Sequence, residues 1–301
     1  MKFVVTGGAG FIGSNIAKML IKKCHKVTVI DNFNTGRKEN LESIQNEIEL
    51  HNVDIRKREA IKEIISDSDG IFHQAALANV NESFSKSKEY FDVNVNGTKN
   101  IFEIAKENEI KVVFASSSSV YGEVEKMPIS ENIDRKPIHP YGQTKLECEF
   151  LAEKFSKQGL KVIGLRYFNV YGLGQNDAYA GVITKFLNKI KENKSPEIFG
   201  DGTQTRDFVF VKDVANANLL AMTSNVNFDF FNVGSQKSIS ILELSQIIIK
   251  NSGVNLKPEF KNALKGDAKM SLSDISLAKK KLNWEPKYKL DKWFKEEVFK
   301  I

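Results

Sequence analysis

The sequence predicts an α/β fold with a doubly wound parallel sheet and a smaller C-terminal domain. Three observations support this prediction. Short runs rich in β-branched residues alternate with helix-length segments, a glycine-rich turn follows the first run, and the alternation loosens after about Tyr171. Strands that alternate with helices form parallel sheets, because each helix carries the chain back to the same edge of the sheet.

The expected elements follow from the spacing of the apolar residues. The predicted strands are 3–6, 27–30, 48–53, 70–73, 111–115 and 161–166. Apolar residues at three-to-four spacing predict helices at 15–22, 59–65, 85–108 and 142–156. We therefore expect a first domain over residues 1–170 and a second over 171–301, with part of the 207–235 region returning to the first domain.

Length and charge narrow the classes of function. A chain of 301 residues can bury about three quarters of its unfolded surface, which is enough for one large domain or two unequal ones. The 44 Lys and Arg against 38 Asp and Glu give a net charge of +6. The lysines are scattered through the expected helices, so the charge argues against nucleic acid as a partner.

Cysteine and histidine usage indicates a reducing compartment and no metal site. Cys24 and Cys148 each lie in a helical pattern without a partner at metal-ligand spacing, and we expect two buried free thiols. The four histidines are dispersed. No signal-peptide pattern precedes the first apolar run, and no apolar run is long enough to span a membrane. We expect a cytoplasmic protein.

The first turn has the chemistry of a phosphate site. Thr6–Gly13 reads TGGAGFIG, a GxxGxxG turn between the first expected strand and helix. Its glycines allow a pyrophosphate to approach the helix N-terminus, which carries about half a positive charge. Asp31 ends the second strand, where a carboxylate binds ribose hydroxyls and repels the extra phosphate of NADP. NAD is therefore the expected cofactor of a Rossmann-type domain, although Arg37 and Lys38 could weaken this discrimination.

Other expected cofactor contacts follow the second, third and fourth strands. Asp54 and Ile55 would flank the adenine, while Ala75 and Ala76 would leave space for the cofactor. Tight packing between strand and helix explains such small residues equally well. The cofactor contacts predicted from these turns are Gly7, Gly10, Phe11, Ile12, Gly13, Asp31, Asn32, Asp54, Ile55, Ala75 and Ala76.

Tyr141 and Lys145 lie one helical turn apart on one helix face. A free phenol has a pKa of about 10, and lowering it to neutrality takes roughly 4 kcal/mol. One cation at about 4 Å in an effective dielectric near 20 supplies roughly that much. The pair therefore predicts a proton-transfer site, in which a nicotinamide cation would complete the shift.

Several motifs together resemble the extended short-chain dehydrogenase/reductase family, and within it the NAD-dependent nucleotide-sugar epimerases. The resemblance covers essentially the whole chain. The motifs are TGGAGFIG, HQAA, NVNGT, SSSSVYG, YGQTK, LRYFNVYG, GDGTQTRDF and LKGD. It implies that Ser117 hydrogen-bonds the reacting hydroxyl, that Tyr141 is the base, and that Lys145 tunes this base and holds the nicotinamide ribose.

The resemblance also implies a reaction. Family members that dehydrate or decarboxylate sugars carry an acid directly before Val-Tyr-Gly, where this chain has Ser118 and Ser119. Oxidation followed by reduction remains: Tyr141 takes the proton of the sugar 4-hydroxyl while hydride leaves carbon 4 for NAD. The 4-keto sugar turns over and hydride returns to its opposite face, so that a UDP-hexose is epimerised at carbon 4.

The resemblance assigns further contacts with the substrate. Arg206 would pair with the diphosphate, Asn169 would contact the substrate, and Phe168 would lie at the nicotinamide. Without the resemblance, a surface ion pair for Arg206 and an Asx turn for Asn169 would be preferred. The remaining substrate contacts are predicted to be Lys185 and Phe186 near the uracil, Asp267 in the late motif, and Ser271 beside the sugar 2-substituent.

Two departures from the family pattern bear on the substrate. Leu264 replaces the arginine of the late motif, which puts one diphosphate contact in doubt, and Ala78 replaces a lysine of some galactose-type epimerases. A serine at 271 leaves room for an N-acetyl group, so we expect UDP-glucose and UDP-galactose to be accepted, together with their N-acetyl forms. An ordinary small strand residue is the alternative reading of Ser271.

Two other functions stay open. A UDP-glucuronate 4-epimerase also fits the ASSSSVYG segment, although such enzymes commonly have threonine where this chain has Asn169. A non-catalytic NAD-binding regulator is the second alternative. Such proteins usually lose the Tyr/Lys pair, which this chain keeps. The expected helices 85–108 and 142–156 resemble the pair that forms the family's dimer interface, so a homodimer is expected.

Overall fold

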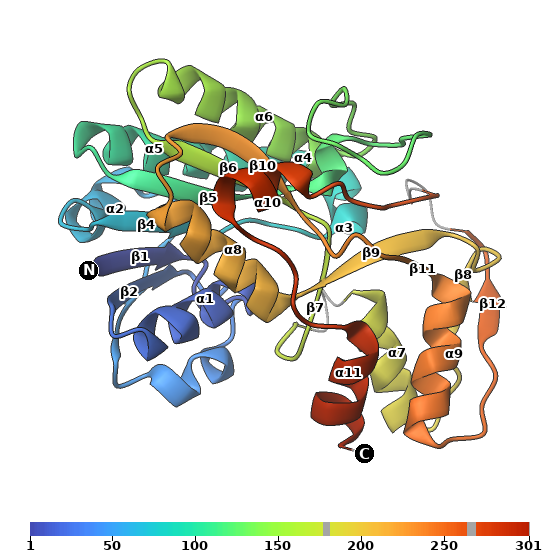
Figure 1. Cartoon of the computed structure of the whole chain (residues 1–301). Helices are drawn as coiled ribbons and strands as arrows, with labels where there is room; N and C mark the ends of the chain where they lie inside the picture. The colour runs from blue at the N-terminus through green and yellow to red at the C-terminus, as the bar shows by residue number, and fades with distance from the viewer. Residues whose placement is uncertain (177–180, 264–268, 301) are drawn as a thin grey trace.

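A seven-stranded parallel sheet forms the centre of the protein (Figure 1). The computed structural model describes residues 1–176, 181–263 and 269–300. The strand order is β10-β6-β5-β4-β1-β2-β3, which confirms the predicted doubly wound parallel fold. The strands of this sheet are β1 (Lys2–Thr6), β2 (Lys26–Asp31), β3 (Ile48–Asn52), β4 (Gly70–His73), β5 (Lys111–Ser117), β6 (Val162–Tyr167) and β10 (Phe228–Val233).

Helices cover both faces of this sheet (Figure 1). The helices of the first 170 residues and the returning segment are α1 (Phe11–Lys22), α2 (Arg58–Ile65), α3 (Val80–Ser85), α4 (Ser87–Phe91), α5 (Gly97–Glu107), α6 (Pro140–Ser156) and α8 (Val211–Thr223). Alternate residues of β1 enter different cores, because successive side chains of a strand point to opposite faces. Phe3 and Val5 pack with α1 and α8, whereas Val4 packs with α2, α5 and α6.

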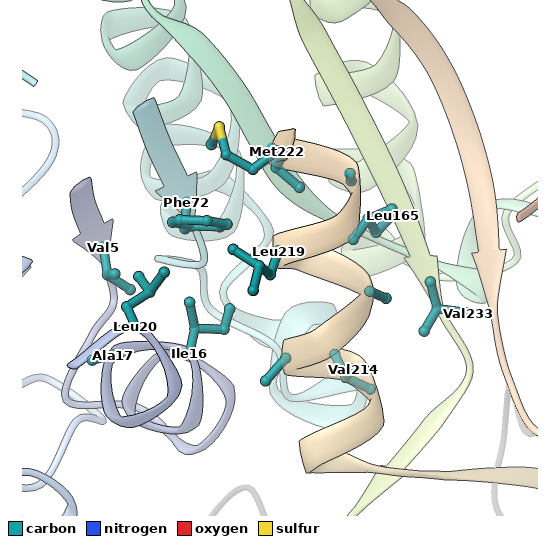
Figure 2. Packing of buried hydrophobic residues seen from close by; sticks show 14 of the residues in the cluster. Val5, Ile16, Ala17, Leu20, Phe72, Leu165, Val214, Leu219, Met222 and Val233 are labelled. Atoms are coloured by element: carbon teal, nitrogen blue, oxygen red, sulfur yellow. The ribbon is translucent and has the colours of Figure 1, made fainter. Parts of the chain in front are cut away.

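The core on one face of the sheet is formed where α1 and α8 lie side by side (Figure 2). Ile16 and Leu20 of α1 are fully buried, and they point toward Phe72 of β4 and Leu219 of α8. α8 leads into β10, which pairs in parallel with β6 at the edge of the sheet. The segment after residue 207 therefore contributes a helix and a strand to the large sheet.

The rest of the C-terminal half forms a smaller lobe of short elements beside the sheet (Figure 1). Its apolar core gathers side chains such as Tyr171, Phe186 and Trp293. The strands are β7 (Asn169–Tyr171), β8 (Glu197–Phe199), β9 (Thr205–Phe210), β11 (Ser238–Ser240) and β12 (Glu259–Lys261). The helices are α7 (Val182–Lys191), α9 (Ile241–Ser252), α10 (Ser276–Leu282) and α11 (Leu290–Trp293), of which α10 packs on the large sheet.

The structure corrects two expectations. The continuous helix predicted over 85–108 is broken into α4, a π-helical segment Asp92–Asn96 and α5, and Ser85 ends the preceding helix α3. The Asn94 side chain in the π-helical segment bonds the backbone of Leu77, a tertiary contact that the apolar spacing does not reveal. Cys24 is exposed rather than buried, and it follows α1 with a φ of +59°.

No helix within residues 1–176, 181–263 and 269–300 is both long enough and apolar enough to cross a membrane.

Replacing Leu20 with alanine tests the α1–α8 packing. We expect the free energy of unfolding to fall by about 2–5 kcal/mol, because a fully buried leucine leaves both lost burial and a cavity. The matched control is Leu50→Ala, since Leu50 is 42% exposed on β3, and its effect should stay within about 0.5 kcal/mol. Urea unfolding measures both values. Equal losses in the two variants would contradict the assigned core.

Candidate active site

A cavity of about 470 Å³ opens at the carboxyl ends of β1, β2, β4 and β5. In a doubly wound sheet, this edge is where ligands bind. The predicted contacts that line the cavity are Gly7, Gly10, Phe11, Ile12, Gly13, Asp31, Asn32, Asp54, Ile55, Ala75, Ala76, Tyr141 and Lys145.

The glycine turn brings backbone against backbone at the mouth of this cavity. Gly7 has a φ of +65°, a region that favours glycine. A Cβ atom on Gly13 would lie 2.2 Å from the carbonyl oxygen of Gly7, so no larger residue fits without a shift of the turn. Gly10 caps α1 without a side-chain hydrogen bond, and no acidic residue lies in the first helical turn. The backbone amides at the N-terminus of α1 are therefore suited to binding a pyrophosphate.

Asp31 is held in place at the end of β2. Its two carboxylate oxygens accept hydrogen bonds from the amides of Ala9 (2.9 Å) and Phe33 (2.8 Å). Burial raises the pKa of Asp31, and these two amides oppose the rise. A carboxylate offers about four acceptor positions, so it can still accept from two ribose hydroxyls. The glycine turn and this carboxylate fit the diphosphate and the adenosine ribose of NAD.

The third strand leads to an ion-pair cluster at the other end of the cavity. Asp54 accepts hydrogen bonds from Asn32 (2.9 Å) and from Nη2 of Arg56 (2.8 Å). The bonds from Arg56 lower the pKa of Asp54 to about 2, and Arg56 also pairs with Asp92 of the π-helical segment. The Asp54 carboxylate is thus already engaged within the protein. Arg56 was not expected from the sequence, although it stands two residues beyond Asp54.

Tyr141 and Lys145 lie together at the inner end of the cavity, on the first turns of α6. The Lys145 ammonium is 5.9 Å from the centre of the Tyr141 ring and donates to the carbonyl of Ala115 (2.9 Å). Imidazole Nδ1 of His139 accepts from the Gly142 amide and caps the helix, while Pro140 occupies its first turn. The helix start therefore fixes where the phenol lies.

Desolvation acts on both members of this pair. Burial raises the pKa of Tyr141 to about 12, and a hydrogen bond with the Ser117 side chain opposes this rise. Burial also lowers the pKa of Lys145. The expected lowering of the Tyr141 pKa by Lys145 together with a nicotinamide cation stays a prediction.

A buried histidine stays neutral beneath this pair. His73 contacts the hydroxyls of Thr6 (2.6 Å) and Thr98 (2.9 Å) through its two ring nitrogens. Burial, with a smaller effect of the Lys145 charge, lowers the pKa of His73 to about 3. Near pH 7 the histidine therefore adds no second positive charge beside Lys145.

Three of the predicted substrate residues gather around Asp207 rather than along the NAD cavity. The Asn169 amide donates to the Asp207 carbonyl (3.4 Å), and Arg206 precedes Asp207 on β9. Ser238, which pairs with Asp207 across the strands, bonds the carbonyl of Ser271 (3.2 Å). Both Arg206 and Ser271 are 9% exposed. Segments distant in the sequence thus meet at one point.

The other predicted contacts lie elsewhere. Phe168 packs with Val120 and Leu146 instead of lining the cavity. Phe186 is buried in the core of the smaller lobe because it belongs to the apolar stripe of α7, so its side chain is not available to stack on uracil. Lys185 is exposed on the same helix. Asp267 lies outside the described residues.

Comparison with known proteins decides the family. The model of the NAD dependent epimerase/dehydratase family matches residues 3–234. The chain belongs to this family. The predicted family, the fold class and NAD as cofactor are therefore confirmed, and so is the prediction of an enzyme.

Three solved structures are similar over nearly the whole chain. The UDP-N-acetylglucosamine 4-epimerase from Methanobrevibacter ruminantium M1, in complex with UDP-N-acetylmuramic acid, is 38% identical with a TM-score of 0.92, covering 99% of this chain and 96% of that one. The UDP-glucose 4-epimerase from Thermotoga maritima with UDP-glucose is 35% identical, with a TM-score of 0.93 and coverages of 99% and 97%. The UDP-glucuronic acid 4-epimerase from Bacillus cereus, with UDP-glucuronic acid and NAD, is 31% identical, with a TM-score of 0.92 and coverages of 100% and 99%.

Sequence reasoning missed a polar group in the cavity wall. The Tyr167 hydroxyl lies 3.0 Å from the amide oxygen of Gln74 and accepts from the amide nitrogen of Asn218 (2.8 Å). Tyr167 and Gln74 line the cavity, and Asn218 is buried on α8. Gln74 and Tyr167 stand inside the motifs HQAA and LRYFNVYG, which were the available signal. Asn218 had none, because only the return of α8 to the sheet brings it there.

Asp31→Asn tests the cofactor site. Each hydrogen bond to a charged group contributes about 1.5–3 kcal/mol, so we expect NAD to bind roughly 10–100 times more weakly, with a smaller preference over NADP. Calorimetric titration with each dinucleotide measures this. Asp67→Asn is the control, because that side chain is 93% exposed on the far side of the fold, and its affinity should equal that of the unmodified protein. An unchanged affinity in Asp31→Asn would contradict the assignment.

Proposed function

We propose that the protein epimerises a UDP-hexose at carbon 4 through a transient 4-keto sugar, with UDP-glucose and UDP-galactose or their N-acetyl forms as substrates. The half-buried Tyr141 and the buried Lys145 in the cavity wall, with the buried Ser117 close to Tyr141, are the observation that carries this proposal. The three similar structures described above are all 4-epimerases of UDP-sugars. The serines at 118 and 119 supply no acid for an elimination.

The chain's own residues account for the proton transfer. NAD, when bound, supplies a hydride acceptor that becomes the donor for the return step, together with a positively charged ring. Ser117 and Lys145 favour the Tyr141 phenolate, and so does the N-terminus of α6, within whose first turn the tyrosine lies. The phenolate takes the proton of the sugar 4-hydroxyl and gives it back when the second epimer forms.

The group around Asp207 is the proposed substrate end of the site. Arg206 supplies a guanidinium fork for the diphosphate, and Asn169 supplies an amide for the sugar or nucleotide. Ser271 leaves space beside the sugar 2-substituent. Lys185 stays a candidate contact for the nucleotide, as does Asp267. We further propose that residues 1–170, with the returning segment α8–β10, hold NAD, and that the remainder of 171–301 binds substrate.

The choice of sugar is the finer part of the proposal. Asn169 and Ser271 favour glucose-type sugars with or without the acetamido group. UDP-glucuronate 4-epimerisation is the alternative activity, and the similarity to the Bacillus cereus enzyme supports it. A regulator that only binds NAD is less well supported, because the three candidate catalytic side chains are all present. Incubation with each UDP-sugar, followed by chromatographic separation of the products, distinguishes these functions.

Tyr141→Phe tests the catalytic role. Loss of a positioned base costs typically about 10²–10⁴-fold, so we expect the turnover number to fall by at least that range while NAD stays bound. Tyr288→Phe is the control, since Tyr288 is 44% exposed and packs on Phe210 away from the cavity. Epimerisation and bound NAD are measured on the same preparations. Undiminished turnover in Tyr141→Phe would exclude the proposed base.

Ser271→Tyr tests the choice between plain and acetylated sugars. A phenol at this position would fill the proposed space, so we expect kcat/KM for the N-acetyl sugars to fall by about tenfold or more relative to the plain sugars. Ser271→Ala keeps the space and should keep the ratio. Competition assays with paired UDP-sugars measure it. If the ratio were the same in both variants, Ser271 would not be the gate.

A homodimer in the cytoplasm completes the proposal. Exposed phenylalanines lie on neighbouring helices of one face: Phe84 on α3, Phe91 on α4 and Phe150 on α6, each 43–46% exposed. Exposed phenylalanines on helices that contact one another are a candidate interaction surface. The occupant proposed here is a second copy of the chain, as the resemblance of these helices implies.

Sedimentation tests the dimer. We expect the unmodified protein to sediment as a dimer and Phe150→Asp to shift it toward the monomer, because a buried unpaired charge is costly. Phe260→Asp is the matched control, since Phe260 is 54% exposed on β12 in the other lobe. A monomer at working concentration for the unmodified protein would remove the dimer from the proposal.

A further inference from the structure

Two side chains of α6, one helical turn apart, form hydrogen bonds with two successive residues of β5. Tyr141, Lys145 and Glu149 share one face of the helix. Lys145 donates to the Ala115 carbonyl (2.9 Å), and the Ser116 hydroxyl donates to Oε1 of Glu149 (2.6 Å). The next residue of the strand, Ser117, lies close enough to Tyr141 to lower its pKa. The end of β5 is thus joined to α6 through Ala115 and Ser116, directly before Ser117.

Glu149 is a fully buried carboxylate with four donors around it. Arg166 of β6 donates from Nε to Oε1 and from Nη2 to Oε2, both at 2.8 Å. Arg135 adds a bond from Nη1 to Oε2 (2.9 Å), and Ser116 supplies the fourth donor. A two-point contact between a guanidinium and a carboxylate fixes direction as well as distance. The position of Ser116 is therefore set by a pair that cannot easily rotate.

The same arginine extends this network to the segment after β5. Nη1 of Arg166 donates to the Tyr121 hydroxyl (2.8 Å), which donates in turn to the side-chain oxygen of Asn232 on β10 (2.7 Å). The Asn232 amide donates to the carbonyls of Ile129 (2.9 Å) and Asp274 (3.1 Å). A chain of hydrogen bonds therefore connects segments that are remote in sequence to the Glu149 carboxylate.

We propose that Glu149 is a positioning residue for the reaction: by joining Ser116 to Arg166, it holds the end of β5 against α6 and fixes Ser117 relative to the Tyr141 phenol. This inference rests on the proposed epimerase function. Glu149 touches neither the cavity nor the phenol, so it acts only through Ser116 and its neighbour on the strand. A purely structural ion pair would stabilise the fold without affecting the ionisation of Tyr141.

Ser116→Ala separates the two roles, because it removes the link to the strand and leaves the Glu149–Arg166 pair intact. We expect kcat to fall roughly tenfold, since small displacements of a reacting group are costly, with little change in the KM for the sugar. The hydrogen bond from Ser117 favours the phenolate, so weakening it raises the pKa of Tyr141. The acid limb of the pH profile of kcat/KM should therefore move to higher pH.

Ser245→Ala is the matched control. Ser245 is also fully buried, and its hydroxyl donates to the Leu242 carbonyl within α9, remote from the cavity. Its kcat and acid limb should match those of the unmodified protein. Glu149→Gln keeps the size of the side chain but loses its charge, and it should show the same shift of the acid limb, with a larger loss of kcat.

The outcomes separate this inference from the function on which it rests. If the unmodified protein converts no UDP-sugar, the proposed function fails. If it does convert one and Ser116→Ala keeps both kcat and the acid limb, the positioning role of Glu149 is wrong. It is equally wrong if Ser116→Ala changes only the affinity for NAD, because that result would make Ser116 a simple lining residue of the cavity. Should Glu149→Gln not fold, Ser116→Ala still decides.

Discussion

The partial burial of Tyr141 at the start of α6 is the constraint on which the proposed chemistry depends. Desolvation there disfavours the phenolate and raises the pKa of Tyr141 to about 12. A lower local dielectric also strengthens the effect of every charge near the phenol, including the buried Lys145 ammonium and any cation that a ligand brings. The ionisation of the proposed base therefore depends on what binds beside it.

The order of the strands explains why the required groups meet. Parallel strands end at the same edge of a sheet, so the turns after β1, β2 and β4 face one cavity, and β5 brings Ala115 and Ser116 into its wall. The crossovers also place α6 over the sheet with its N-terminus at that edge. The glycine turn and the Tyr141–Lys145 pair are more than 130 residues apart in sequence, counted from Gly7 to Tyr141, and yet line the same cavity.

Two buried carboxylates organise the neighbourhood of the site in similar ways. Glu149 gathers Ser116 and Arg166, while Asp207 accepts from the amide and hydroxyl of Ser235 and of Ser273. Burying such charges is expensive unless every lone pair is used. Each of these carboxylates fixes the positions of the segments around it, because a carboxylate surrounded by donors permits few other arrangements of the segments that supply those donors. One organises the proton-transfer end, and the other organises the group that contains Arg206.

The sequence by itself determined the alternation of strands and helices, the glycine turn, Asp31, and the Tyr141–Lys145 pair, because local spacing and local chemistry encode each of them. Only the tertiary structure decided which long helix was broken at Asp92–Asn96, that Phe186 belongs to a core, and that Asn218 reaches Tyr167. It also showed that desolvation opposes the Tyr141 phenolate. The physical reason is the same in each case. Desolvation and packing depend on which residues folding brings together, and the spacing of residues along the chain does not reveal these contacts.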